Sequence, residues 1–219
     1  MLTGKEILMI LEGLRDTLII VGLSTVFGYI LGLPLGIVLA VTDKEGIKPN
    51  RIVYKTLDLI TNVLRSFPFI ILLVVLIPLT RAIVGKSYGT GATIVPLVVA
   101  AAPFIGRMVE SSLKEVDKGV IEAAQSLGAD NLTIIFRVLI TEARTSLLVG
   151  ATIAFGTILG YSAMAGAVGG GGLGSIAIRY GYNRFQPQIL WPSVIILILL
   201  VQLFQILGTR ISRKLDRRK

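Results

Sequence analysis

The sequence predicts an all-α, polytopic membrane protein. Hydrophobic residues make up 53% of its 219 residues, and the mean hydropathy is +0.81. Charged residues make up 16%, well below the roughly 25% that is typical of soluble domains. Apolar runs of about 20 residues recur along the chain, long enough to cross about 30 Å of hydrocarbon as helices. In lipid such runs must be helical, because no water satisfies an open backbone.

We expect one transmembrane domain over residues 1–219 with five membrane-spanning helices. The expected spans cover residues 17–41, 56–79, 91–108, 147–168 and 190–208. A long polar interval, residues 109–144, separates the third span from the fourth. This layout leaves no room for a separate soluble catalytic domain.

Ahead of the first span, the sequence predicts a short helix of its own. Thr3 and Glu6 have the spacing of a capping box, and apolar residues follow on one side. Glu12 and Asp16 interrupt the region where a signal peptide would need an apolar core. We interpret this segment as an interfacial helix. The alternative is that it is the start of the first span.

The distribution of Lys and Arg predicts how the chain is oriented. Cytoplasmic loops collect these residues, so the strongly basic segment 210–219 is placed inside. Five spans then put the N-terminus outside, and the loop 42–55 and the interval 109–144 fall inside with most of the 22 Lys and Arg. The net charge of +9 is therefore read as a topology signal of a plasma (inner) membrane protein. It does not indicate a nucleic-acid surface.

The composition argues against an enzyme. Cysteine and histidine are absent, which excludes thiolate metal sites and removes the usual imidazole base or ligand. The run Gly169–Gly174 satisfies G-x-G-x-x-G, but it lacks the strand and βαβ unit of a dinucleotide site. It is not a P-loop either, because Ser175 and Ile176 stand where Lys and Ser or Thr are required. We expect no catalytic and no metal-binding residues in this chain.

The polar interval contains a predicted short helix. Asp117 is a suitable N-cap for helical turns over Val120–Leu127, and Gly128 is placed to end them. Asp130 or Asn131 can cap a second short helix, which extends to Arg137.

The surface of the first of these helices favours docking of another protein. Ala123 and Ala124 are small, so a partner can approach the backbone closely. Glu122 suits the positive end of the helix dipole and can also pair with a basic group of a partner. An ordinary helix within a loop is the alternative interpretation.

Glu122-Ala123-Ala124 followed by Gly128 resembles the EAA loop of permease subunits of ABC importers. In that family the loop forms a coupling helix that fits a cleft in a cytoplasmic ATPase. The resemblance implies the following coupling residues: Glu122, Ala123, Ala124, Ser126, Leu127 and Gly128. The family pattern continues with Ile-x-Leu-Pro, where this chain ends in Thr141 instead of proline. The docking residues are unaffected by that departure.

The resemblance extends over nearly the whole chain. The stretches Arg65–Leu72 and Gly160–Gly169 are similar to the methionine-importer permeases of this group, as is the segment 179–185. This implies a type I ABC importer fold and a homodimer that forms the pathway for L- or D-methionine. It also implies two ATPase subunits, which hold ATP and magnesium and hydrolyse the ATP, and an extracytoplasmic methionine-binding protein. No cofactor is expected in this chain.

Two alternatives remain open from the sequence. The first is a permease for another small amino acid or a related solute. The second is an ion-coupled secondary carrier, which would often show an acidic residue deep in a span. In this sequence Asp58 and Glu142 instead lie near the expected inner ends of spans.

Arg65 is the single charge deep within an expected span. A charge at mid-helix costs about 2.5–3.5 kcal/mol on insertion scales, so it usually faces a protein interior or a water-filled cavity. Snorkelling toward the inner surface is the alternative. Pro68 removes one helical hydrogen bond and should kink the same span. We expect Arg65, Ser66 and Pro68 to shape the translocation path.

The end of the fourth span and the run after it, from Tyr161 to Gly174, are expected to form part of an outer gate. Tyr161 and Met164 are the candidate pore-facing side chains, and Gly169 begins an irregular glycine-rich backbone. Such backbone is tolerated at membrane depth only where protein or water satisfies it. A flexible outer connection without a gating role is the alternative.

A stripe of small residues marks the first span. Gly28, Gly32 and Gly36 repeat every four residues, which provides a smooth face for close helix packing. We expect packing within the chain, and a seam between two copies is the alternative.

Overall fold

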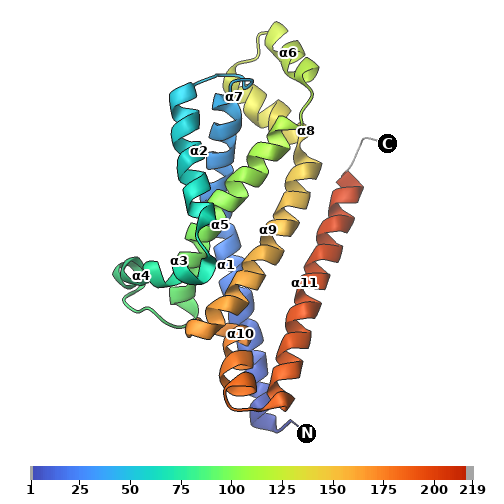
Figure 1. Cartoon of the computed structure of the whole chain (residues 1–219). Helices are drawn as coiled ribbons and strands as arrows, with labels where there is room; N and C mark the ends of the chain where they lie inside the picture. Colours follow the sequence, from blue (N-terminus) through green and yellow to red (C-terminus); the bar gives the residue numbers. More distant parts are fainter. Residues whose placement is uncertain (1, 216–219) are drawn as a thin grey trace. The chain divides into compact units, whose positions relative to one another are not determined.

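The computed structural model describes residues 2–215, and the all-α prediction is confirmed, since no strand occurs in that range (Figure 1). Residues 216–219, which supply part of the basic C-terminus used for orientation, lie outside the described residues. The helical segments are α1 (Gly4–Thr42), α2 (Arg51–Ser66), α3 (Phe69–Val75), α4 (Ile77–Val84), α5 (Thr90–Lys114), α6 (Lys118–Ser126), α7 (Asn131–Thr133), η1 (Ile134–Leu139), α8 (Ile140–Glu142), α9 (Arg144–Ala165), η2 (Gly166–Val168), α10 (Gly172–Ile176), η3 (Ala177–Tyr182) and α11 (Pro187–Leu215).

Within residues 2–215, four helices are long and apolar enough to cross a membrane. They are α1, α5, the stretch Arg144–Tyr182 and α11. A fifth crossing requires α2 and α3 together, and this pair is bent by 102° at its break. Five spans are therefore present when the bent pair is counted as one.

The second expected span, residues 56–79, is broken and not merely kinked. The chain forms α2, α3 and α4 in this region, with Pro68 at the N-cap of α3 in an extended conformation (φ −58°, ψ 128°). Proline has no backbone N–H and disfavours helical geometry in the residue before it, here Phe67. Both effects act at the same peptide unit, so the helix ends at Ser66 and restarts in a new direction.

The N-terminal segment is not a separate interfacial helix. It is the first part of α1, which runs unbroken from Gly4 to Thr42. The expected capping box is present, since the Thr3 N–H donates to the Glu6 carboxylate at 2.7 Å. Farther along, the Thr17 hydroxyl donates to the Gly13 carbonyl at 2.8 Å. No proline lies between the capping box and the first span, and the helix accommodates Gly13, so the two segments join.

The described residues fold as two compact units. The first comprises residues 2–28, 67–101 and 155–205, and the second comprises residues 29–66, 102–154 and 206–215. The division falls inside α1, α5, α9 and α11 and between α2 and α3.

In the first unit the glycine-rich run is an ordered, tightly packed connection. A Cβ on Gly166 would lie 2.3 Å from the backbone at residues 174–175, so only glycine allows these two segments to touch. The run is tied to α1 because the Leu173 N–H donates to the Thr17 hydroxyl at 2.8 Å. The irregular backbone is thus satisfied by protein groups, as the membrane requires.

In the second unit the C-terminal half of α1 packs directly on α5. A Cβ on Gly32 would lie 2.7 Å from the Ala102 carbonyl oxygen, and one on Gly36 would lie 2.4 Å from the Gly106 carbonyl oxygen. The expectation of packing within the chain is confirmed for Gly32 and Gly36. The close approach brings the polar ends of α1 and α5 to the same part of the unit, where the candidate site lies.

Candidate functional site

Helix α6 is built by local caps, as the sequence predicts. The Asp117 carboxylate accepts the Gly119 N–H at 2.7 Å at its start. At its end the Gly128 N–H donates to the Gln125 carbonyl at 2.9 Å, and Gly128 has a left-handed φ of +79°. A residue with a side chain is strained in that conformation, so glycine stops the helix here.

The surface of α6 is open to a partner. None of its residues is buried, and Glu122, Ala123 and Ser126 are exposed, whereas Ala124 is half-buried. Leu127 follows directly and is 88% exposed. A leucine so fully in water beside small residues forms an apolar contact point that another protein can cover.

A second cap follows α6. The Asp130 carboxylate accepts the Thr133 N–H at 3.2 Å and begins α7. Hydrogen bonds from Thr133 lower the pKa of Asp130. The expected second helix does not stop at Arg137, because α7 continues through the π-helical η1 to Leu139 and into α8.

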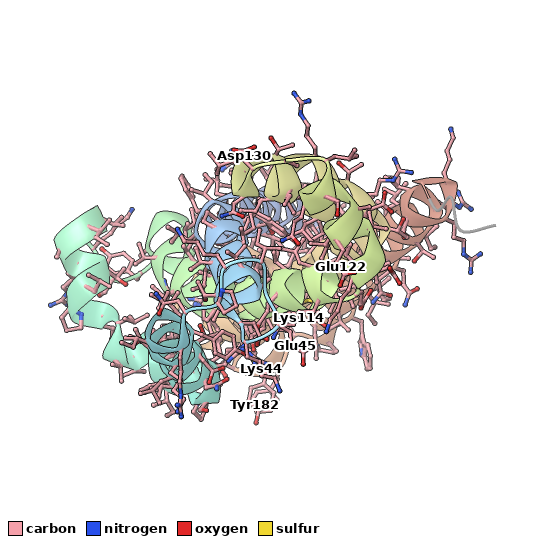
Figure 2. All side chains as sticks on the ribbon, turned by 90° about the horizontal axis from the view of Figure 1, so that it is seen from above. Lys44, Glu45, Lys114, Glu122, Asp130 and Tyr182 are labelled. Carbon is pink, nitrogen blue, oxygen red and sulfur yellow. The ribbon has the colours of Figure 1, made fainter. Side chains whose placement is uncertain are left out.

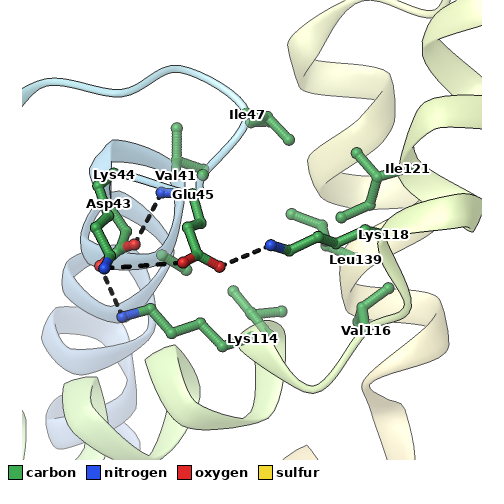
Figure 3. Close-up of a pocket in the computed structure, with 13 residues that line it drawn as sticks. Val41, Asp43, Lys44, Glu45, Ile47, Lys114, Val116, Lys118, Ile121 and Leu139 are labelled. Carbon is green, nitrogen blue, oxygen red and sulfur yellow. Dashed lines mark hydrogen bonds and ion pairs between the residues drawn. The ribbon is translucent and has the colours of Figure 1, made fainter.

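One salt bridge attaches α6, and a second attaches the end of α5, to the segment that follows α1. Lys118 at the start of α6 pairs with Glu45 at 2.7 Å, and Lys114 at the end of α5 pairs with Asp43 at 2.9 Å. We call these four residues the anchor cluster. Figure 3 shows both pairs at the edge of a cavity of about 290 Å³ that Ile121 of α6 also lines. Seen from above, Glu45 and Lys114 lie close together, whereas Asp130 lies apart (Figure 2).

The salt bridges of the anchor cluster shift the pKa values of its residues. The hydrogen bond and charge of Lys118 lower the pKa of Glu45, and Glu45 in turn raises the pKa of Lys118. Burial tends to raise the pKa of Asp43, but the Glu45 backbone N–H and the Lys114 ammonium outweigh it and leave this pKa lowered. Both acids are therefore ionised, and both pairs formed, at neutral pH.

A second group of charges joins α2 to α5 inside the same unit. Arg107 bonds to the Asp58 carboxylate on α2 and to Glu110 at 2.7 Å. Glu110, only 4% exposed, also accepts from Lys114 at 2.7 Å and from the Tyr54 hydroxyl at 3.1 Å. We call these five residues the α2–α5 cluster. Because Lys114 belongs to both clusters, an unbroken set of polar contacts connects Asp43 to α2.

The α2–α5 cluster was not predicted from the sequence. A signal was present, since Arg107, Glu110 and Lys114 follow one another at helical i+3 and i+4 spacings, which bring side chains together on one face. Their partners Asp58 and Tyr54 come from another helix, about 50 residues away in sequence. That pairing depends on the packing of α2 on α5.

The predicted path residues of α2 lie at its end. Arg65 and Ser66 are exposed, and the Ser66 hydroxyl donates to the Asn62 carbonyl at 2.8 Å. Arg65 lines a cavity of about 330 Å³ together with Arg107. Arg65 thus borders open space next to the break at Pro68.

The predicted gate residues lie in the first unit. The Tyr161 ring stacks on Phe69, with centroids 4.5 Å apart and planes 4° from parallel, which places Tyr161 beside the helix that Pro68 begins. Met164 is 48% exposed. Gly169 has a φ of +85°, and its carbonyl accepts the Gly89 N–H at 2.9 Å. Tyr161 therefore packs at the helix break, while Met164 faces outward.

Among the described residues no group of three or more acidic, histidine or cysteine side chains is arranged to hold a metal ion.

Comparison with known proteins agrees with this geometry. A family model described as binding-protein-dependent transport system inner membrane component matches residues 32–219. The probable D-methionine transport system permease protein MetI of Vibrio cholerae is 46% identical over 210 residues, which is 96% of this chain and 93% of the relative. The methionine import system permease protein MetP of Bacillus subtilis is 39% identical over 180 residues, 82% of this chain and 81% of the relative.

Solved structures extend the similarity to three dimensions. A chain from the inward facing conformations of the MetNI methionine ABC transporter has a TM-score of 0.97 and 45% identity, and the match covers 99% of this chain and all of that one. A chain of an amino acid ABC transporter solved with histidines has a TM-score of 0.73 at 20% identity, which indicates the shared fold alone.

Proposed function

The chain belongs to the family of binding-protein-dependent transport system inner membrane components, and from this premise we propose that it is the membrane-spanning permease subunit of a methionine ABC importer. The observation that carries the proposal is the match over 99% of the chain to a chain of a methionine ABC transporter, at 45% identity and a TM-score of 0.97. The chain is a transport subunit of the inner membrane and not an enzyme. ATP is used by a separate ATPase subunit.

We further propose that α6 is the coupling helix. Its exposed Glu122, Ala123, Ser126 and Leu127, its half-buried Ala124, and the turn at Gly128 form the surface that meets the ATPase. Support comes from the exposure of this surface and from the sequence Glu122-Ala123-Ala124. If α6 meets the ATPase, then α6 and the C-terminus are cytoplasmic, and the N-terminus is outside.

Two copies of the chain would form the pathway, with two ATPase subunits below and a methionine-binding protein above. Closure of the ATPase pair would pull on α6. The anchor cluster links α6 to the connection between α1 and α2, and the α2–α5 cluster continues that link into α2. A movement of α6 would therefore reach Arg65, Ser66 and the break at Pro68, which we propose shape the path. Tyr161, Met164 and Gly169 would form the outer gate.

Reconstitution tests the proposed function. Proteoliposomes that contain this chain and the cognate ATPase, supplied with the methionine-binding protein, should accumulate L- or D-methionine only when ATP is enclosed in the lumen, on the cytoplasmic side of the transporter. Omission of either partner should abolish uptake. Uptake driven by an ion gradient through this chain alone would contradict the proposal and support the secondary carrier. Uptake of another amino acid in preference to methionine would contradict the substrate.

The Glu45–Lys118 pair should control the mobility of α6. The chain contains no cysteine, so a Gln125→Cys variant gives a single spin-label site on an exposed face of α6. Label mobility should rise in Glu45→Lys and in Lys118→Glu, because like charges then face each other, and should return toward the original value in the double variant.

The same label should report the pH dependence of that pair. Lys118 lowers the pKa of Glu45 below its ordinary value of 4.5, so the contact is complete above that value and is lost as pH falls through the lowered pKa. Label mobility should therefore increase only below about pH 4.5. In Glu45→Gln, label mobility should not change as the pH falls through this range. A flat profile for the unsubstituted pair would contradict a role for this contact.

A further inference from the structure

A second cavity of the same unit has the chemistry of an amino-acid site. It has a volume of about 330 Å³ and lies among α2, α5 and α9. This volume is at the lower end of the roughly 300–1,000 Å³ of ligand pockets, which suits a single small molecule. The lining residues that carry the argument are Arg65, Phe104, Met108, Ser112, Glu115 and Val149.

The cavity offers one positive and one negative group that are not committed elsewhere. Within residues 2–215, neither Arg65 nor Glu115 forms a salt bridge. Arg107 also lines the cavity, but Asp58 and Glu110 already compensate its charge. A charged side chain in the membrane region usually faces a protein interior or a water-filled cavity and has a partner. Arg65 lies within the expected second span and borders such a space, whereas Glu115 borders it from the polar interval 109–144. Among residues 2–215 neither of them has a counterion.

The rest of the lining combines hydroxyl groups with an apolar wall. The Ser146 hydroxyl donates to the Ser112 hydroxyl at 2.9 Å, and both residues border the cavity. Phe104, Met108 and Val149 supply apolar surface. The flexible, polarizable thioether of Met108 adapts to side chains of different shape.

We infer that this cavity binds a free α-amino acid with an apolar side chain. Arg65 receives the carboxylate through its planar guanidinium, which matches that group in geometry. Glu115 receives the ammonium group, and the side chain lies against Phe104, Met108 and Val149. A residue within a peptide lacks both charges, so the site selects the free amino acid. The inference rests on the proposed function, because it identifies a binding site for the transported substrate within the permease.

Photolabelling tests the site directly. The purified complex with its ATPase is irradiated with a diazirine analogue of methionine, and labelled peptides are identified by mass spectrometry. Label is expected on α5 and α9 around Phe104, Met108 and Val149. Excess methionine should prevent labelling. Methioninamide and N-acetylmethionine should not, because each lacks one of the two charges.

Substitutions separate binding from structure. Arg65→Met and Glu115→Gln should each reduce labelling by about tenfold or more, because a charge-assisted contact is lost, and Arg65→Lys should retain part of it. In Arg65→Met, methionine should also lose its advantage over methioninamide as a competitor, a change that a merely structural residue would not produce. Two matched controls should label normally. They are Arg51→Met, which is on α2 away from the cavity, and Glu142→Gln, which borders only an adjoining cavity.

The outcomes distinguish this inference from the proposed function. The proposed binding site is overturned if the label is found elsewhere, or if both Arg65→Met and Glu115→Gln show normal labelling and competition. Methionine uptake by the same complex would still support the proposed transport function. Labelling at the cavity in a complex that imports no methionine supports the site and contradicts the function. Thermal unfolding of each variant is measured in parallel, and Arg65→Lys replaces Arg65→Met in the comparison if Arg65→Met unfolds early.

Discussion

Replacement of Leu127 by alanine should weaken assembly of the permease with its ATPase by at least about thirtyfold, which corresponds to the roughly 2 kcal/mol of an interface hot spot. Leu127 is 88% exposed in this chain, so its apolar surface gains from burial only when a partner covers it. The neighbouring Ala123 and Ala124 are small enough for that partner to approach closely. The change is measured by titration of the ATPase onto the permease in nanodiscs.

Ile52→Ala is the matched control. Ile52 is 80% exposed and lies in the first turn of α2, outside the α6 surface, so its loss should leave the affinity for the ATPase unchanged. Neither substitution should lower the thermal stability of the isolated permease, because both side chains are in solvent. Equal weakening by both variants would argue for a general effect of apolar surface, and no weakening by Leu127→Ala would remove α6 as the docking element.

Loss of the Glu110 carboxylate should produce the largest change in stability. Glu110 is 4% exposed and pairs with both Arg107 and Lys114. Removal of one partner from a buried ionic group costs about 3–5 kcal/mol, because the remaining charges lose their compensation. Glu110→Ala should therefore unfold at a markedly lower temperature in detergent. Unfolding is measured by tryptophan fluorescence or light scattering.

Two further variants define the cause. Glu110→Gln keeps hydrogen-bonding atoms but loses the charge, so its unfolding temperature should lie between those of the original protein and Glu110→Ala. Glu122→Ala is the control for loss of an acid, because Glu122 is exposed on α6 and should matter for docking and not for stability. An unfolding temperature of Glu110→Ala equal to that of the original protein would mean that the α2–α5 cluster does not stabilise the fold.

Features that depend on neighbours in sequence were predicted well. The cap at Asp117 and the stop at Gly128 bracket α6 in the structure, and the capping box at Thr3 and Glu6 is present. Each of these interactions spans two or three residues, so the residue types at fixed spacing contain the necessary information. Two local errors concerned helix extent. The N-terminal segment joins the first span, because no proline separates the cap from that span, and the helix that Asp130 caps continues past Arg137.

Features that depend on the packing of distant segments were not predictable. Pro68 indicated a disturbed helix, but neither the bend of 102° nor the stacking of Phe69 on Tyr161 could be derived from the residues around it. Lys118 meets Glu45 across 73 residues, and Arg107 meets Asp58 across 49. No periodicity relates such positions, because each pair forms only after two helices have packed.

The sequence by itself determined that this protein is a helical membrane permease with a short capped helix in its polar interval. Apolar run length, the distribution of Lys and Arg, and local caps are properties of adjacent residues. Only the tertiary structure decided which charges neutralise each other. Packing of α2, α5 and the end of α1 pairs Asp43, Asp58 and Glu110 with their cations. In the part of the chain that the structure describes, it leaves Arg65 and Glu115 beside a cavity without a salt bridge. Contacts between distant segments thus decide which charges are paired and which are left beside the cavity. This cavity is where we expect the transported amino acid to bind.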